Sequence, residues 1–281
     1  MHRLPPHERW MLALTGSFVT KSPIIFLAAL ATLPTVALGQ DGGDAELAKQ
    51  LSNPVSSLIS VPFQSNYDCC FGPEDAGKFT LNIQPVVPVK LNEDWNVIVR
   101  TIVPVIWQDE TVAGQGDSFG FGDVTQSFFF TPRKAGGVTW GIGPAILYPL
   151  GNDELGSEKW GLGPTALVLK QSGPTTIGLL ANHIWSVAGE KNRQDISATF
   201  LQPFYAYAYP NSTTISINLE STYDWKHEQW TIPLNAGVSH IYKFGEQRVS
   251  LAVQGRFYLE QPDRGPEWGA RFVATLLFPK N

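Results

Sequence analysis

Residues 214–224 read TISINLESTYD, and the character of their side chains alternates with a period of two. One face of this stretch is apolar or aromatic, formed by Ile215, Ile217, Leu219 and Tyr223. The other face is polar, formed by Ser216, Asn218, Glu220, Thr222 and Asp224. Successive side chains of a β-strand point to opposite sides, so the pattern predicts a strand with one apolar and one polar face. Its length suits a tilted membrane-crossing strand of about 9–11 residues better than a soluble strand of about 5–6.

The same alternation extends over most of the chain. Segments 248–259 and 268–278 repeat it, and around Trp95 a set of apolar residues opposes Arg100. Twelve such segments can be placed, at 58–66, 78–89, 95–107, 120–131, 138–148, 159–170, 175–188, 196–209, 213–224, 229–241, 248–259 and 268–278. An even number of strands puts both termini on one side, as in bacterial outer-membrane barrels. We therefore predict an all-β fold, a membrane up-and-down antiparallel barrel of about twelve strands over residues 58–281. In segments 175–188 and 196–209 both faces are largely apolar, so their orientation stays open and they could line a passage for apolar solutes.

The connections and the aromatic residues agree with this prediction. Alternate connections are short and contain turn residues, as in 172–174 and 210–212, whereas the set that includes 108–119 and 149–158 is longer and richer in acid. Aromatic residues lie near the predicted strand ends, namely Trp95, Trp107, Trp225, Trp230, Trp268 and Phe278. Rings at these depths are typical of the interfacial girdles of membrane barrels.

Composition narrows the functional classes. Charged residues make up only 16% of the 281 residues, aromatic residues 12%, and the mean hydropathy is −0.06, which argues against a helical membrane protein. The sequence contains no basic patch that would indicate nucleic acid as a partner. The net charge is −5 for the whole chain, and removal of residues 1–39, with three basic residues and one acidic residue, would make it −7. A mildly acidic protein could bias a pore towards cations.

The N-terminus resembles a secretory signal. The apolar stretch 23–39 follows Lys21 and ends in Ala37-Leu38-Gly39, so we predict a signal peptide over residues 1–39, with Met11 as a possible alternative start. Residues 40–57 contain flexible glycines and a short segment that Asp44 could cap as a helix. We interpret them as a periplasmic lead-in or as a short plug inside the barrel, and a mobile tail stays an alternative.

The cysteines and glycines give weaker signals. Cys69 and Cys70 are adjacent, and the simplest interpretation is two loop thiols; a strained vicinal disulfide or an intermolecular bond are the alternatives. No further ligands near them in sequence indicate a metal site. The motif Trp-Gly-X-Gly-Pro occurs at 140–144 and again at 160–164, where the glycines would leave room in the lumen or let the strand bend. We expect no cofactor and no catalytic residue.

The candidate functional residues are polar side chains on the faces that should line the lumen. They are Asn82, Gln84, Arg100, Asp123, Thr125, Asn218, Glu220, Asp224, Gln254, Arg256 and Arg271. Arginine facing lipid would cost about 2–4 kcal/mol at the membrane midplane, so the three arginines should point inward and pair with Asp123 or Glu220. These charges either brace the barrel wall or form an electrostatic constriction that orients a permeant.

Several stretches together resemble the outer-membrane family named after the meta-pathway of phenol degradation. They are SVPFQ at 60–64, LNIQP at 81–85, FGDVTQS at 121–127, GSEKWG at 156–161, ANHIWS at 181–186 and ESTYD at 220–224, and the resemblance covers nearly all of residues 47–280. It implies a transporter in the outer membrane of a Gram-negative bacterium that admits small solutes, often aromatic or hydrophobic compounds. The implied partners are outer-membrane lipid, a small-molecule permeant and the outer-membrane insertion machinery. Nothing in the sequence indicates an oligomeric state.

Other functions stay open at this point. A lipid hydrolase needs His and Ser on one strand face, but His183 and Ser186 differ in parity and should point to opposite faces. A triad assembled across strands is still compatible with the sequence. A structural or surface barrel would carry longer loops than those found here, and a soluble sandwich would have shorter strands.

Overall fold

The computed structural model describes residues 42–279, except for 73, 110, 112–115 and 135. The predicted signal peptide therefore lies outside the described residues. The described residues contain one helix, α1 (Gly42–Leu51), which is neither long nor apolar enough to cross a membrane. The strands are β1 (Ile59–Phe71), β2 (Ala76–Ile83), β3 (Val86–Lys90), β4 (Trp95–Gln108), β5 (Ser118–Phe121), β6 (Val124–Pro132), β7 (Thr139–Tyr148), β8 (Lys159–Ser172), β9 (Thr175–Gly189), β10 (Ser197–Ala208), β11 (Thr213–Leu219), β12 (Ser221–Asp224), β13 (Gln229–Thr231), β14 (Pro233–Phe244), β15 (Gln247–Tyr258) and β16 (Trp268–Phe278).

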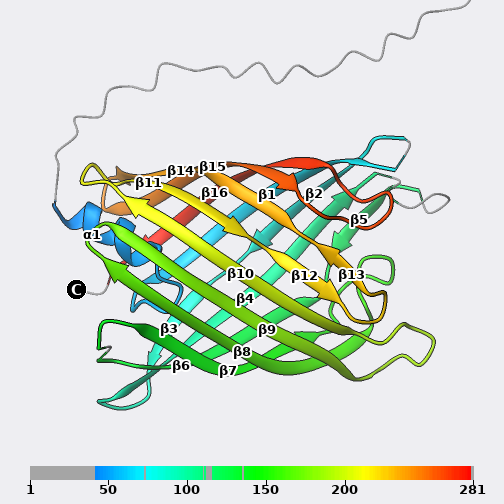
Figure 1. Cartoon of the computed structure of the whole chain (residues 1–281), viewed down its shortest axis with the longest axis horizontal. Helices are drawn as coiled ribbons and strands as arrows, with labels where there is room; N and C mark the ends of the chain where they lie inside the picture. Colours follow the sequence, from blue (N-terminus) through cyan, green and yellow to red (C-terminus); the bar gives the residue numbers. More distant parts are fainter. Residues whose placement is uncertain (1–41, 73, 110, 112–115, 135, 280–281) are drawn as a thin grey trace, which may run out of the picture. The chain divides into compact units, whose positions relative to one another are not determined.

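These segments form a closed antiparallel barrel of twelve membrane-crossing strands, as predicted (Figure 1). Four crossing strands each consist of two consecutive segments, namely β2 with β3, β5 with β6, β11 with β12, and β13 with β14. The ring closes where β1 pairs with β16, with Ile59 opposite Phe278. Both ends of the barrel chain therefore lie at the same rim, and in bacterial barrels of this kind that rim faces the periplasm.

The two faces of the wall follow the alternation in the sequence. On β16, Trp268 and Phe272 are exposed on the outside, while Arg271 and Thr275, which have the opposite parity, are only 4% exposed. On β15, Val253 is 60% exposed and Phe257 is 57% exposed, whereas Arg256 on the opposite face is buried. Large apolar side chains that stay exposed around a whole barrel are suited to lipid, because a soluble protein would bury them.

Two interruptions of the strands fall at polar lumen residues. Gln84 and Pro85 separate β2 from β3, and Glu220 separates β11 from β12. The backbone stays hydrogen-bonded across both positions, because Gln84 donates to the carbonyl of Pro62 and Glu220 to that of Pro233. A local irregularity of this kind changes the direction of a side chain, while the hydrogen bonds between neighbouring strands are kept.

Helix α1 and the residues after it lie against the barrel interior at the periplasmic rim. Leu47 and Ala48 pack in a buried cluster with Leu58, Ala208, Ile241 and Leu277. Further along, Val55 packs into a second buried cluster with Ile98, Phe129, Leu167, Leu169 and Leu180. Asp44 forms an ion pair with Arg248 on β15, and the carbonyl of Lys49 accepts a hydrogen bond from Gln171. The segment is thus attached by apolar packing and by polar contacts to several strands.

The structure corrects three expectations. Strand β1 continues to Phe71 rather than ending near residue 66, so residues expected in a loop belong to the wall. Cys69 and Cys70 form a vicinal disulfide in that strand and are not free thiols. A Cβ at Gly163 would collide with the carbonyl oxygen of His183, so this glycine permits close approach of β9 to β8 rather than leaving room in the lumen.

Candidate functional site

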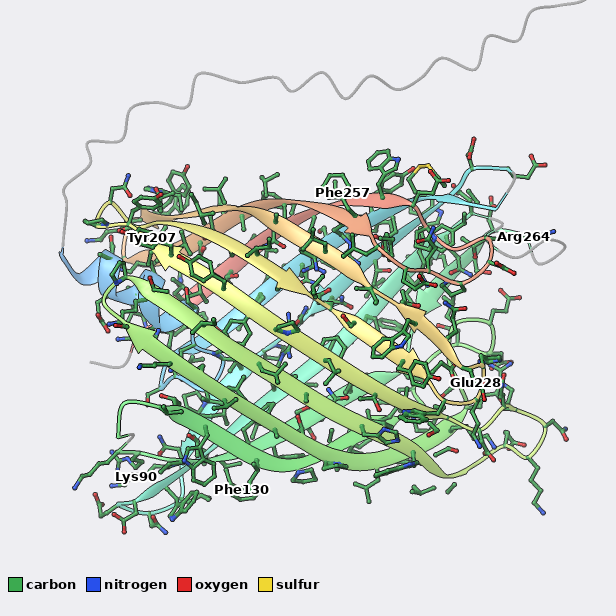
Figure 2. The ribbon with its side chains drawn as sticks, in the orientation of Figure 1. Lys90, Phe130, Tyr207, Glu228, Phe257 and Arg264 are labelled. Atoms are coloured by element: carbon green, nitrogen blue, oxygen red, sulfur yellow. A yellow bond between two sulfur atoms is a disulfide. The ribbon has the colours of Figure 1, made fainter. Side chains whose placement is uncertain are left out.

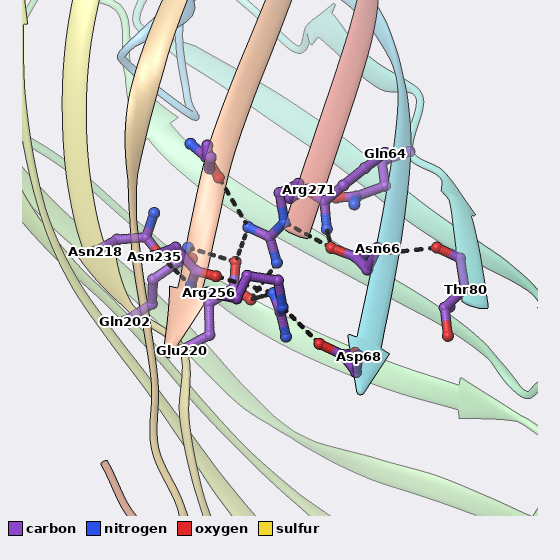
Figure 3. Close-up of polar contacts among 12 residues, drawn as sticks. Gln64, Asn66, Asp68, Thr80, Gln202, Asn218, Glu220, Asn235, Arg256 and Arg271 are labelled. Atoms are coloured by element: carbon purple, nitrogen blue, oxygen red, sulfur yellow. Dashed lines mark hydrogen bonds and ion pairs between the residues drawn. The ribbon is translucent and has the colours of Figure 1, made fainter. Parts of the chain in front are cut away.

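A set of charged and amide side chains projects into the lumen from neighbouring strands of the wall and is here called the central network. Its members are Asn66 and Asp68 of β1, Glu220 between β11 and β12, Asn235 of β14, Gln254 and Arg256 of β15, and Arg271 of β16. Figure 3 shows the two arginines converging on Glu220 from β15 and β16, with Asn66 and Asp68 on the opposite side. Residues from five separate regions of the chain therefore meet at one level of the barrel.

Arg271 and Glu220 form the tightest contact of the network. The guanidinium donates from NH2 to Oε2 at 2.7 Å and from NH1 to Oε1 at 2.8 Å, which is a two-bond, fork-like arrangement. Its Nε donates to Asn66 Oδ1 at 2.6 Å, and NH1 also lies 3.4 Å from Gln254 Oε1. With every nitrogen engaged, the orientation of Arg271 is fixed.

Arg256 joins a second carboxylate to the network. Its Nε donates to Asp68 Oδ1 at 2.9 Å, and its NH1 reaches Asn235 Oδ1 at 2.9 Å and Glu220 Oε2 at 3.3 Å. Its NH2 donates to the hydroxyl of Tyr258 at 3.0 Å. Asn235 is fully buried, and its Nδ2 donates a hydrogen bond to Asn218 Oδ1 at 3.0 Å. Largely buried charges that are paired and hydrogen-bonded in this way hold one another in a fixed arrangement.

The central network lies between cavities. On the extracellular side is a cavity of about 1150 Å³, whose lining includes Glu220, Arg256 and Arg271 together with residues of the β1–β2 and β15–β16 loops. On the periplasmic side a cavity of about 280 Å³ is bounded by Gln84, Asn218, Gln254 and the end of α1. A third cavity of about 200 Å³ lies beside α1 and is lined by Arg100, Gln84 and Gln202.

The lumen also has an apolar wall. Ile98, Phe129, Leu167, Leu169 and Leu180 are at most 3% exposed and come from β4, β6, β8 and β9, and Phe200 and Phe204 of β10 pack beside them. In segments 175–188 and 196–209, whose orientation the sequence left open, apolar side chains therefore face the interior as well as the lipid. The interior combines a charged side and an apolar side.

Most of the candidate residues lie on the inner face. Glu220, Gln254, Arg256 and Arg271 belong to the central network, and Asn218 extends it. Gln84 accepts a hydrogen bond from Arg100 at 2.8 Å, and Asn82 lines the extracellular cavity. Thr125 has the parity of buried Ser127 and Phe129 on β6.

Two candidates lie apart from the central network. The sequence predicted that Asp123 could pair with the arginines, but it does not. It accepts hydrogen bonds from the backbone of Gly151 and from Ser157, so it holds the loop between β7 and β8. The reason is that Asp123 lies at the break between β5 and β6, next to that loop. Asp224 lies at the end of β12, where its carboxylate contacts the ring of His227 and the backbone of Lys226.

Several members of the network were not predicted from the sequence. Asn66 and Asp68 escaped because the first strand was ended too early, although their alternation with Tyr67 continues the pattern. Asn235 lay within a predicted strand to which no inner face was assigned. Tyr258, which accepts a hydrogen bond from Arg256, has the same parity as Arg256 on β15, and this parity was the available signal.

The hydrolase alternative can be compared with the geometry. His183 lies 2.7 Å from Thr199 Oγ1 and 3.4 Å from Ser197 Oγ on the neighbouring strand. Among the described residues no carboxylate is hydrogen-bonded to His183, and Ser186 instead donates to Asp195. No cluster of His, Cys, Asp and Glu in the described part of the chain could hold a metal ion.

A closed antiparallel barrel with an apolar outer surface and a charged interior defines the class of outer-membrane β-barrel proteins. The model of the family described as "Putative MetA-pathway of phenol degradation" matches residues 80–281, and the chain belongs to this family. No curated protein matches the chain.

Several solved structures are similar to the chain. An outer membrane channel from Pseudomonas putida F1 superimposes with a TM-score of 0.62 at 13% identity, covering 79% of this chain and 96% of that one. The outer membrane phospholipase A of Escherichia coli gives a TM-score of 0.45 at 10% identity, covering 78% and 90%. The CymD monoaromatic hydrocarbon channel gives 0.42 at 9% identity, covering 87% and 92%. The first of these likenesses shows that the chain has the fold of an outer-membrane barrel.

Proposed function

We propose that the protein is a channel through which small solutes cross the outer membrane, and that it is not an enzyme. The observation that carries this proposal is the arrangement of cavities on both sides of the central network, from the extracellular loops to α1. A barrel that served only as a structural element would not need an interior with fixed charges on one side and apolar residues on the other. The channel from Pseudomonas putida F1 with the same fold supports this proposal.

The permeants that suit this interior are small and partly apolar. Phe200 and Phe204 of β10, which are partly buried against the apolar wall, offer contact to a hydrocarbon or aromatic body, while the central network offers hydrogen bonds. The family description, which names phenol degradation, agrees with small aromatic compounds. Glu220, Arg256 and Arg271 would form the constriction, and Asn82, Gln84, Arg100, Thr125, Asn218 and Gln254 would line the path.

Residues 40–57 would act as a plug on the periplasmic side. Leu47, Ala48 and Val55 are buried against the barrel interior, and the Asp44–Arg248 ion pair attaches the helix to β15. A plug of this size would limit conductance until it moves. Removal of residues 1–39 as a signal peptide and delivery to the outer-membrane insertion machinery belong to the same proposal.

Single-channel conductance of the mature protein in a planar bilayer tests the proposal. We expect stable conductance steps, small for the wild type and larger when α1 is loosened. The proposal would be wrong if neither the wild type nor a variant with a weakened α1 conducts in membranes shown to contain folded protein.

A further inference from the structure

Among the described residues, Arg100 differs from Arg256 and Arg271 in forming no hydrogen-bonded ion pair with a carboxylate. Its NH2 donates to Gln84 Oε1 at 2.8 Å, and it forms no ion pair with any acid that the structure describes. A guanidinium has five N–H donors, so most of its capacity is left for another partner. The side chain is half-buried, which leaves part of it accessible inside the barrel.

The charges at this level of the lumen are unbalanced. Arg100, Arg256 and Arg271 face two carboxylates, Asp68 and Glu220, and both carboxylates are engaged by Arg256 and Arg271. The three arginines and the two carboxylates leave one net positive charge, and Lys78, opposite Asp68 on β2, does not reduce it. An uncompensated charge inside a protein is costly, so this position favours an anion.

The cavity next to Arg100 has a mixed lining. Its volume is about 200 Å³, and the amides of Gln84 and Gln202 lie on its polar side with Arg100. Leu51 and Pro54 of the plug segment and Leu180 of β9 provide its apolar side. A ligand that fits would combine an anionic group with a compact hydrocarbon body.

From this geometry we propose that Arg100 and its cavity form a binding site for small amphipathic monocarboxylates, of the class of aromatic acids. The carboxylate would accept two hydrogen bonds from the guanidinium, and the ring would contact Leu51, Pro54 and Leu180. Inorganic phosphate shares the charge but has no apolar part for this side of the cavity. The inference rests on the proposed channel function, because it names a solute class for the same lumen.

Titration calorimetry on the folded full-length mature protein tests the site, with benzoate, benzyl alcohol and inorganic phosphate as probes. We expect benzoate to bind, and benzyl alcohol and phosphate to bind more weakly. Arg100→Gln removes the guanidinium and should weaken benzoate about 10- to 100-fold, the usual range for a hydrogen bond to a charged group.

Gln84→Glu tests the same site in a different way. This near-isosteric change gives Arg100 a carboxylate of the protein's own at the position of the present 2.8 Å contact. We expect the new ion pair to weaken benzoate as much as Arg100→Gln does, while the barrel keeps its heat-modifiable migration on gels. Arg133→Gln, at the periplasmic turn where Arg133 pairs with Glu93, removes the same charge away from the cavity and should leave binding unchanged.

The outcomes distinguish this inference from the proposed function. Benzoate affinity that is unchanged in folded Arg100→Gln and Gln84→Glu, or that falls equally in Arg133→Gln, overturns the carboxylate site whether or not the protein conducts. Binding lost in the two cavity variants alone supports the site, even if no conductance is found. Stronger binding of phosphate than of benzoate would also overturn it, because the apolar side would then play no part.

Discussion

Glu220 is the side chain that holds the two arginines of the central network in place. Glu220→Gln would leave Arg256 paired only with Asp68, and Arg271 with no carboxylate within the network. Breaking a buried ion pair from one side costs about 3 kcal/mol, so we expect the free energy of unfolding in lipid vesicles to fall by about that amount. Urea titration of the folded protein measures this change.

Glu220→Gln also tests whether these charges only brace the barrel wall or form an electrostatic constriction in the lumen. It raises the net charge at mid-lumen by one positive charge, which should shift ion selectivity towards anions in reversal-potential measurements. Glu228→Gln, on the exposed extracellular turn after β12, changes the same charge outside the barrel wall and should alter neither property. Lower stability with unchanged selectivity would leave Glu220 with a purely structural role.

Asp195, in the extracellular loop between β9 and β10, gives a pH-dependent contact. The hydrogen bond from Lys159, at 3.1 Å, and that from Ser186 lower the pKa of Asp195 below its usual value. Because the folded pKa is lowered, the stabilisation is present above the usual carboxyl pKa of about 3.9 and is lost as pH falls through the folded value. We expect this loop to become more susceptible to pepsin at the acid end of the range.

Asp195→Asn provides the comparison for this measurement, because it carries no charge at any pH. The ratio of cleavage rates, variant over wild type, should exceed one near pH 5 and approach one near pH 2. A ratio that stays constant over this range would show that the carboxylate does not hold the loop.

Helix α1 is attached to the periplasmic rim by the Asp44–Arg248 ion pair, by the hydrogen bond from Gln171 to the carbonyl of Lys49 and by a small apolar cluster. Asp44→Asn combined with Leu47→Ala removes the pairing with Arg248 and a buried leucine side chain, and a core Leu→Ala change costs about 2–5 kcal/mol. A helix attached this weakly should leave the lumen more often, so we expect larger or more frequent conductance steps. Glu46→Gln, on the exposed side of the same helix, is the matched control. Unchanged conductance in the double variant would exclude α1 as the plug.

Comparison of elements shows what the sequence could and could not predict. The alternation in 248–259 and 268–278 predicted the strands and their inner arginines, because lipid on one side makes a polar residue on that face costly. Positions where a strand is interrupted were less predictable: Asp123 shares the parity of a lumen residue, but the break beside it directs its carboxylate to a loop. The partners of Arg256 and Arg271 come from strands far apart in sequence. Their register, which brings Asp68 and Glu220 together, depends on closure of the whole barrel.

The barrel as a whole has charges of opposite sign at two depths. The extracellular cavity outside the central network is lined by five acids, Glu74, Asp75, Asp109, Asp117 and Asp263, against Lys78 and Arg264. Deeper in the lumen, Arg100, Arg256 and Arg271 outnumber Asp68 and Glu220. Cations would therefore gather in this extracellular cavity, the outer vestibule, whereas the interior favours anions. The ion selectivity of the channel then depends on which of the two regions limits the current.

Neutralising part of the vestibule should separate the two contributions. Glu74→Gln, Asp75→Asn and Asp263→Asn together remove three exposed charges from the lining of the cavity near Arg264, which is labelled in Figure 2, and leave the central network intact. In water a charge at about 8 Å contributes about 0.5 kcal/mol, roughly a twofold change in local cation concentration, so the cation-to-anion permeability ratio should fall severalfold in dilute salt. The effect should vanish in 1 M KCl, where screening acts over about 3 Å instead of about 10 Å at 0.1 M.

Glu93→Gln with Asp94→Asn, at the exposed periplasmic turn after β3, is the control that should have no such effect. A ratio that is insensitive to salt in both proteins would mean that the arginine level alone sets selectivity, since those charges lie inside the barrel, where screening by salt is weak.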